Sequence, residues 1–105
     1  MKTLTKPRHS VIVHFNYGMD ELDPLHDLEC KLEKVIMENE VGEYDGHEIA
    51  MDGSDGFLYM YGFNAETLFK TVKPTLEATE FMKGATAQLR FGPPEDGVME
   101  IEVEI

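Results

Sequence analysis

Hydrophobic and polar residues alternate in three stretches of the chain, 10–17, 85–92 and 98–105. A period of two is typical of β-strands that bury one face and expose the other. In the first stretch, one face carries Val11, Val13, Phe15 and Tyr17, and the other carries Ile12, His14 and Asn16. Each stretch is therefore predicted to be a strand of a sheet with one buried side.

The last two stretches predict neighbouring antiparallel strands. The residues between them, 93–97, read PPEDG and have the composition of a turn. If Gly92 lies opposite Val98, apolar residues face apolar residues and polar residues face polar ones. The predicted pairs are Leu89 with Ile101 and Ala87 with Val103 on one face, and Arg90 with Glu100, Gln88 with Glu102 and Thr86 with Glu104 on the other.

Two other stretches have apolar residues at helical spacing. For the first, Asp23 is a predicted N-cap with Pro24 after it, and Gly42 is the predicted C-cap. The second is predicted to start after Asn64, to be kinked or divided at Pro74, and to close before Gly84. The two apolar stripes are Leu25, Leu28, Leu32, Val35 and Ile36, and then Ala65, Leu68, Phe69, Val72 and Leu76.

The segment between these helices predicts two more strands. Residues 43–46 have turn composition, 47–51 predict a short strand and 52–56 predict a hairpin loop. Residues 57–63 are apolar on both faces, which is typical of a central strand. Two orientations of this strand stay open: it exposes either Phe57, Tyr59, Tyr61 and Phe63, or Leu58 and Met60.

The predicted order of elements is β-α-β-β-α-β-β. It indicates a two-layer α+β fold of the ferredoxin-like type, with an added C-terminal β-strand that forms a hairpin. The 105 residues suit a single domain, 1–105, with a polar leader at 1–8. Because two helices cover only one face of such a sheet, we expect the other face to contact solvent or a partner.

The uncovered face of the sheet is the predicted binding site. Its centre is apolar in either orientation of 57–63 and its edge is charged, a composition typical of protein-interaction surfaces. The predicted partner-binding residues are Ile12, His14, Leu58, Tyr59, Met60, Tyr61, Arg90, Glu100 and Glu102. A protein partner and self-association are both open, and the remaining alternative is that these are the few exposed apolar atoms that are normal on a monomer.

Charge narrows the choice of partner. The chain has 9 lysines and arginines against 21 aspartates and glutamates, a formal net charge of −12. Nucleic acid is disfavoured because binding to phosphates requires basic residues, whereas a basic protein surface suits the charge. The acidity also serves simple solubility. No apolar stretch approaches the roughly 20 residues of a membrane span, and the single cysteine fits the reducing cytoplasm.

Side chains suited to catalysis or metal binding are few and scattered. The four histidines have no metal-ligand spacing with Cys30, so no metal or cofactor is predicted. His26 lies one helical turn before Cys30, and His14 falls near the acidic edge; either could serve an enzyme, but an incidental surface thiol and a solvated histidine are simpler. The loop at 52–56 lacks the glutamate of a calcium-binding EF-hand and is expected to be only a turn.

Four segments carry a resemblance to known proteins. They are EYDGHEI at 43–49, LYMYG at 58–62, LF at 68–69 and RFGPP at 90–94. Together they resemble a pattern in small bacterial proteins of unassigned function. In size, acidity and the Tyr-Asp-Gly turn, the chain is also similar to the regulator-of-ribonuclease-activity B group, which inhibits ribonuclease E. That similarity implies an acidic, ferredoxin-like protein binder and identifies no contact or catalytic residue.

The leading hypothesis from the sequence is a non-enzymatic, cytoplasmic protein-binding module of bacterial type, an inhibitor or immunity-like regulator. The alternative is a homodimeric, α+β barrel-like protein that binds or converts a small ligand. An enzyme that depends on Cys30 or His14 is the third class.

Overall fold

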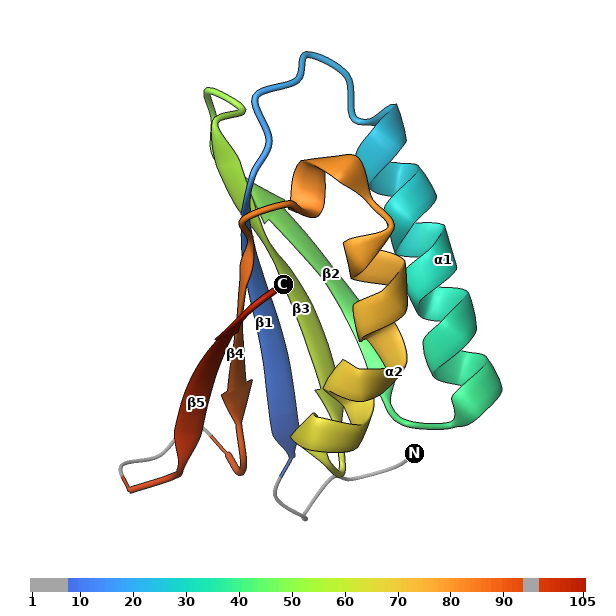
Figure 1. Ribbon diagram of the computed structural model, residues 1–105, viewed down its shortest axis with the longest axis vertical. Coiled ribbons are helices and arrows are strands. Elements are labelled where there is room, and N and C mark those ends of the chain that lie inside the picture. Colours follow the sequence, from blue (N-terminus) through green and yellow to red (C-terminus); the bar gives the residue numbers. More distant parts are fainter. Residues whose placement is uncertain (1–7, 94–96) are drawn as a thin grey trace, which may run out of the picture.

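The computed structural model describes residues 8–93 and 97–105. The elements are β1 (His9–Asn16), α1 (Asp23–Asn39), β2 (Glu43–Ile49), β3 (Asp55–Gly62), α2 (Ala65–Glu77), the 3₁₀ helix η1 (Glu80–Met82), β4 (Thr86–Arg90) and β5 (Glu100–Glu104). Within these residues, one antiparallel sheet has the strand order β2-β3-β1-β4-β5. Both α-helices lie on the same side of it (Figure 1). The fold is therefore α+β with two layers, compatible with a ferredoxin-like layout.

The core lies between the sheet and the helices, where both predicted apolar stripes are buried. The helices contribute Leu25, Leu28, Leu32 and Ile36 from α1 and Ala65, Leu68, Phe69, Val72 and Leu76 from α2. The sheet contributes Val11, Val13 and Phe15 from β1, Leu58 and Met60 from β3, and Ala87 and Leu89 from β4. Each large side chain buried in this way stabilises the fold by about 1.5–3 kcal/mol.

The start of α2 follows the prediction, whereas its end and both ends of α1 depart from it. Asn64 caps α2, since its side-chain oxygen accepts a hydrogen bond from the Thr67 N–H at 2.9 Å. The helix is not divided at Pro74, and it ends at Glu77 and not just before Gly84. Asp23 is already the first residue of α1, without a side-chain cap before it, and Glu40 is the left-handed C-cap in place of Gly42. A Cβ on Gly42 would lie 2.0 Å from the carbonyl oxygen of Tyr61, so glycine is needed there for a close approach to β3.

Residues 43–46, predicted to be a turn, form the first half of β2. This strand pairs with β3, and its register shifts between Tyr44 and Gly46. The turn-like composition therefore marks a β-bulge and not a reversal of the chain. The reversal comes later, in the loop at 51–54, and Met51, predicted to be in the strand, is fully exposed there.

The orientation of β3 is decided by its neighbours in the sheet. Leu58 lies opposite Val13 and Met60 opposite Val11, and the side chains of all four are completely buried beneath the helices. The prediction that Leu58 and Met60 contact a partner was therefore wrong, because both are needed to fill the core. Alternation along the strand places Phe57, Tyr59 and Tyr61 on the other face.

The pairing of β4 with β5 has the register that the alternation of the sequence predicts. Cross-strand neighbours are Thr86 and Glu104, Ala87 and Val103, Gln88 and Glu102, Leu89 and Ile101, and Arg90 and Glu100. β5 is the strand at one edge of the sheet. Residues 94–96 of the predicted turn and residues 1–7 of the predicted leader lie outside the described residues.

Candidate functional site

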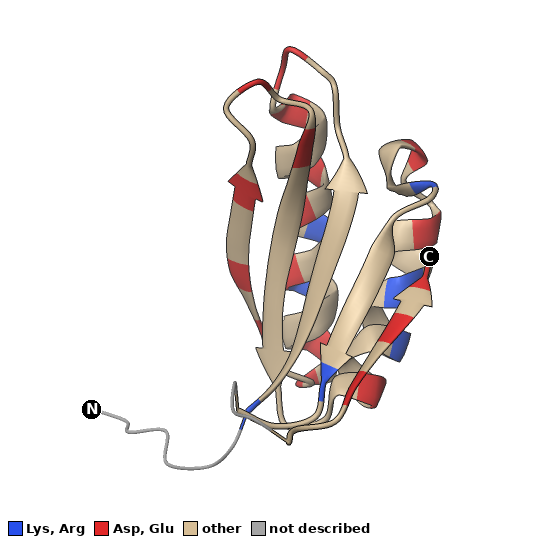
Figure 2. Ribbon diagram, turned by 90° about the vertical axis from the view of Figure 1, so that its left-hand side faces the viewer, with Lys and Arg blue, Asp and Glu red and all other residues tan. Residues whose placement is uncertain are grey.

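The open face is the side of the sheet turned away from α1 and α2. Figure 2 views it directly: acidic residues lie along the outer strands β2 and β5, and the middle of the face is uncharged. The strands contribute Ile12 and His14 from β1, Phe57, Tyr59 and Tyr61 from β3, Thr86, Gln88 and Arg90 from β4, and Glu100, Glu102 and Glu104 from β5. The sheet thus brings together all the predicted partner-binding residues except Leu58 and Met60.

Aromatic rings line the middle of the open face. The rings of Phe57 and Tyr59 stack with their centroids 6.3 Å apart, and the ring of His14 lies 4.7 Å from that of Phe57. Ile12 is directly opposite Tyr59 on the neighbouring strand. Phe57, Tyr59 and Ile12 are each half-buried. Their packing holds the rings in place while one side of each stays accessible.

Carboxylates border the aromatic strip on the β2 side. The Tyr59 hydroxyl donates a hydrogen bond to Glu48 at 2.6 Å. This bond is the largest cause that raises the pKa of Tyr59 to about 12, with loss of hydration and the negative charge of Glu48 adding to it. Asp55 lies 2.8 Å from Nε2 of His14, and a hollow of 340 Å³ opens between Glu48, Asp55 and Phe57. A cationic group placed here would meet two carboxylates beside an aromatic ring.

A second row of carboxylates borders the strip on the β5 side. Glu100 accepts hydrogen bonds from Arg90 Nε at 2.7 Å and from Gln88 at 2.6 Å. Glu102 and Glu104 form no hydrogen bond or ion pair with the described residues. At the lower end of the face, Arg8 is paired with Glu43 at 3.4 Å. The arginines near this face are therefore neutralised within it, and the carboxylates of Glu102 and Glu104 remain uncompensated.

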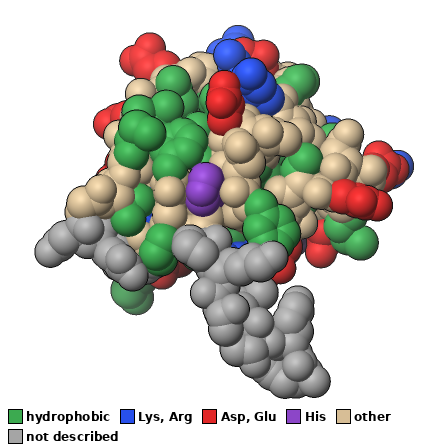
Figure 3. Space-filling view, turned by 90° about the horizontal axis from the view of Figure 1, so that it is seen from below, with side chains coloured by type: hydrophobic (Ala, Val, Ile, Leu, Met, Phe, Trp, Pro, Cys, Tyr) green, Lys and Arg blue, Asp and Glu red, His purple; other side chains and the backbone are tan. Residues whose placement is uncertain are grey.

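At the lower end of the molecule, the hydrophobic surface is less continuous than the row of aromatic rings on the open face. Seen from that end, hydrophobic side chains form separate patches that polar atoms interrupt (Figure 3). There Nδ1 of His9 accepts the N–H of Ala65 at 3.0 Å, and the His9 ring lies 5.5 Å from that of Phe91. His9 thus stabilises the first turn of α2 through this hydrogen bond and packs against Phe91.

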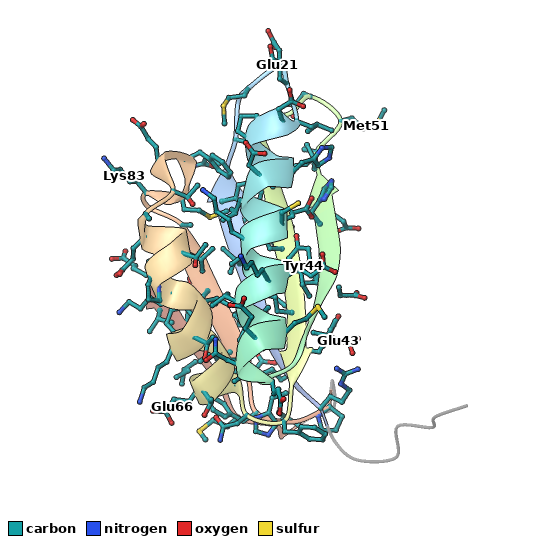
Figure 4. The ribbon with its side chains drawn as sticks, turned by 90° about the vertical axis from the view of Figure 1, so that its right-hand side faces the viewer. Glu21, Glu43, Tyr44, Met51, Glu66 and Lys83 are labelled. Carbon is teal, nitrogen blue, oxygen red and sulfur yellow. The ribbon has the colours of Figure 1, made fainter. Side chains whose placement is uncertain are left out.

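A polar cluster between α1 and β2 was not predicted from the sequence. Oε2 of Glu29 accepts the Tyr44 hydroxyl at 2.5 Å and lies 2.7 Å from Nδ1 of His47, and the Glu29 side chain is 16% exposed. Burial, followed by this hydrogen bond, raises the pKa of Tyr44. Figure 4 shows Tyr44 at the junction of the two elements. The cluster went unseen because residues 43–46 were predicted to be a turn, and no short motif links positions 29, 44 and 47.

The chemistry of this cluster is that of a carboxylate that orients a histidine. Because Nδ1 of His47 faces Glu29, Nε2 is the nitrogen turned away from the carboxylate. The ring of His26 lies 6.3 Å from that of His47. Within the described residues, no group of three or more His, Cys, Asp or Glu side chains is arranged to hold a metal ion.

The other predicted candidates are dispersed over the surface. Cys30 is exposed on α1. Asp52 accepts the N–H of Ser54 at 2.9 Å, a bond that closes the turn before β3, as the sequence predicts for this loop. Hydrogen bonds from Ser54, first from its side chain and then from its backbone, lower the pKa of Asp52. In the part of the chain that the structure describes, neither helix is long and apolar enough to cross a bilayer.

Comparison of the chain with protein-family models, with curated proteins and with solved structures found no match.

Proposed function

We propose that this chain is a non-enzymatic protein-binding module whose open face binds a basic surface of another protein, as an inhibitor or immunity protein does. In this proposal the fold is a ferredoxin-like β-α-β-β-α-β unit with a C-terminal β-hairpin strand. Its setting is the cytoplasm of a bacterium.

The observation that carries the proposal is the combination of accessible rings and uncompensated carboxylates on the open face. Tyrosine and other aromatic side chains supply much of the binding energy at protein interfaces, because they bury a large area with few rotatable bonds. The rings of Phe57 and Tyr59 are already fixed by their stacking. The carboxylates of Glu102 and Glu104 are available to lysine or arginine side chains of a partner, and such complementarity speeds encounter.

A second copy of the chain fits the open face less well. If two open faces stacked against each other, the acidic rows of β2 and β5 on one copy would lie close to the acidic rows of the other copy. Repulsion between these like charges would weaken the dimer. The proposal therefore predicts a monomer at micromolar concentration. The alternative, a homodimeric barrel-like protein with a small ligand between its sheets, predicts a dimer, and light scattering distinguishes the two.

Affinity capture from the source cell, followed by mass spectrometry, tests the proposal when it is done with matched variants. Tyr59→Asp places a charge in the aromatic strip, and Met37→Asp makes a similar change on α1, where Met37 is 66% exposed on the other side of the molecule. A partner held by the wild type and by Met37→Asp, but lost with Tyr59→Asp, supports the open face as the binding site. Equal capture by both variants contradicts it, provided that circular dichroism shows both to be folded.

A further inference from the structure

The backbone of β5 has hydrogen-bonding groups turned toward the outside of the sheet. The Phe91 N–H bonds to Met99 O and the Ile105 N–H bonds to Ala85 O, each at 2.9 Å. In an antiparallel pair, positions of this kind recur at every second residue, so in β5 Ile101 and Val103 also bond to β4. Glu100, Glu102 and Glu104 hold the intervening positions, and their N–H and C=O groups point to the outer edge.

The two edges of the sheet differ in their readiness to pair with another strand. β2 is interrupted by its bulge between Tyr44 and Gly46, and a bulge hinders pairing. β5 pairs with β4 without any shift of register. No other strand among the described residues pairs with β5, so its outer edge offers a regular ladder.

The two faces of β5 have opposite chemistry. On the helix side, a groove of 360 Å³ lies between α2 and the β4–β5 pair. Its lining is apolar at Phe69, Leu89, Phe91, Ile101 and Val103, and α2 adds the charged side chains of Glu66, Lys70 and Lys73. Ile101 is 45% exposed, because β5 extends beyond the layer of helices (Figure 1). On the open face the same strand carries Glu100, Glu102 and Glu104.

We propose that the β5 edge binds an extended segment of a partner protein as a sixth, antiparallel strand, and that this segment alternates basic and apolar residues. Its backbone completes the ladder at Glu100, Glu102 and Glu104. Residues opposite these glutamates place their side chains on the open face, where lysine or arginine is complementary. The intervening residues point to the helix side, where apolar side chains extend the groove beside Ile101 and Val103.

A second copy of β5 is not the occupant. Its sequence, EIEVE, would place glutamates opposite glutamates in a self-paired ladder, and like charges directly opposite one another are destabilising. The acidic side chains thus protect the edge against self-pairing while they select a basic strand. This edge site goes beyond the open-face function proposed above. The two share the carboxylates of Glu102 and Glu104, but the ladder and the groove do not use the aromatic strip, so the two sites can be tested separately.

The test uses the whole chain and an acetylated seven-residue peptide, KVKVKVK. Binding is followed by nuclear magnetic resonance and by amide hydrogen exchange. We expect saturable binding that slows exchange at Glu100, Glu102 and Glu104 by about tenfold or more, with little change at Ile101 and Val103, which already bond to β4. A block peptide of the same composition, KKKKVVV, is the control for net charge and hydrophobicity. Equal binding of the block peptide, or no binding at millimolar concentration, would overturn the proposal.

Methylated peptides test the ladder without altering the protein. In the antiparallel arrangement the lysine N–H groups face β5 and the valine N–H groups face away. N-methylation of the central lysines is therefore expected to weaken binding about tenfold or more, and N-methylation of the valines to have little effect. Equal effects, or the reverse order, would overturn the proposed strand.

Protein variants separate this site from the open face. Glu102→Pro removes one outward N–H and is expected to weaken binding of KVKVKVK, whereas Glu102→Gln retains the N–H and keeps most of the affinity. Tyr59→Asp, which disrupts the open face, is expected to leave this binding intact. Peptide-induced changes confined to Phe57 and Tyr59 would overturn the edge proposal while supporting the open face. A dimer of the free chain joined through β5 would also overturn it.

Discussion

Nε of Arg90 lies 2.7 Å from Oε2 of Glu100, its direct cross-strand neighbour. Beside this pair, the carboxylates of Glu102 and Glu104 on the β5 side of the open face have no ion-pair partner among the described residues. The negative potential of this row therefore persists although a cation lies beside it, and this potential can be tested by reversing charges.

The double variant Glu100→Lys with Glu102→Lys is expected to slow association with a basic partner about tenfold or more at low ionic strength, because it replaces attraction by repulsion. The fold should persist, since the exposed pair with Arg90 contributes at most about 1 kcal/mol. Stopped-flow mixing with the captured partner measures the rate.

The matched control for this charge reversal is Glu33→Lys with Glu38→Lys on α1. Both variants change the net charge by the same amount, from −12 to −12 + 4 = −8. If the control slows association as much as the β5 variant, steering depends on total charge and the open face has no special part in it.

The hydroxyl of Tyr59 is expected to ionise at a pKa of about 12, because it donates a hydrogen bond to Glu48 that only its neutral form can make. This pKa is above the ordinary 10.0 of the unfolded chain. The stabilising contribution of the bond is therefore fully present below pH 10 and is lost as the pH rises from 10 to 12. Ultraviolet titration measures the ionisation of the tyrosines, and the ionisation that disappears in the Tyr59→Phe variant is the one that belongs to Tyr59.

Replacement of Glu48 by alanine provides the control for this titration. The hydrogen-bond acceptor and its negative charge are both removed, so the pKa of Tyr59 should move toward 10.0. An unchanged pKa would show that Glu48 is not its cause.

Glu29→Ala is expected to lower the free energy of unfolding by about 1–3 kcal/mol, because it deprives both the Tyr44 hydroxyl and His47 Nδ1 of their acceptor. Urea denaturation at pH 7 measures the change. Glu33→Ala, on an exposed position one turn further along α1, should change stability by no more than about 0.5 kcal/mol. Similar losses of stability in the two variants would mean that the partly buried cluster of Glu29, Tyr44 and His47 contributes nothing beyond helix propensity.

Neighbouring residues of β3 should respond oppositely to truncation. Leu58→Ala is expected to cost about 2–5 kcal/mol, since the side chain is completely buried against Val13. Phe57→Ala should cost less stability but weaken partner binding, because its ring lies on the open face. Thermal unfolding and partner affinity, measured on the same two variants, check both expectations. If the Leu58→Ala protein stays stable but binds the partner more weakly, the result would contradict the orientation of β3 in which Leu58 is buried in the core.

The amino-acid sequence by itself determined the elements whose two faces differ in polarity. The helical stripes follow from apolar residues at helical spacing. The burial of one face of β1 and the register of β4 with β5 follow from alternation, because a shift by one residue would place charged side chains in the core. Asn64 was likewise predictable as a cap, since the hydrogen bond it makes reaches only three residues along the chain.

Tertiary structure alone decided what depends on neighbours distant in sequence. β3 is apolar on both faces, so its orientation came from packing against Val11 and Val13 under the helices. The bulge in β2 exists only in its pairing with β3. The joining of Glu29 with Tyr44 and His47 required α1 and β2 to be placed side by side. The groove beside β5 exists because α2 stops short of the edge strand, and the extent of a helix over a sheet is a property of the assembled layers.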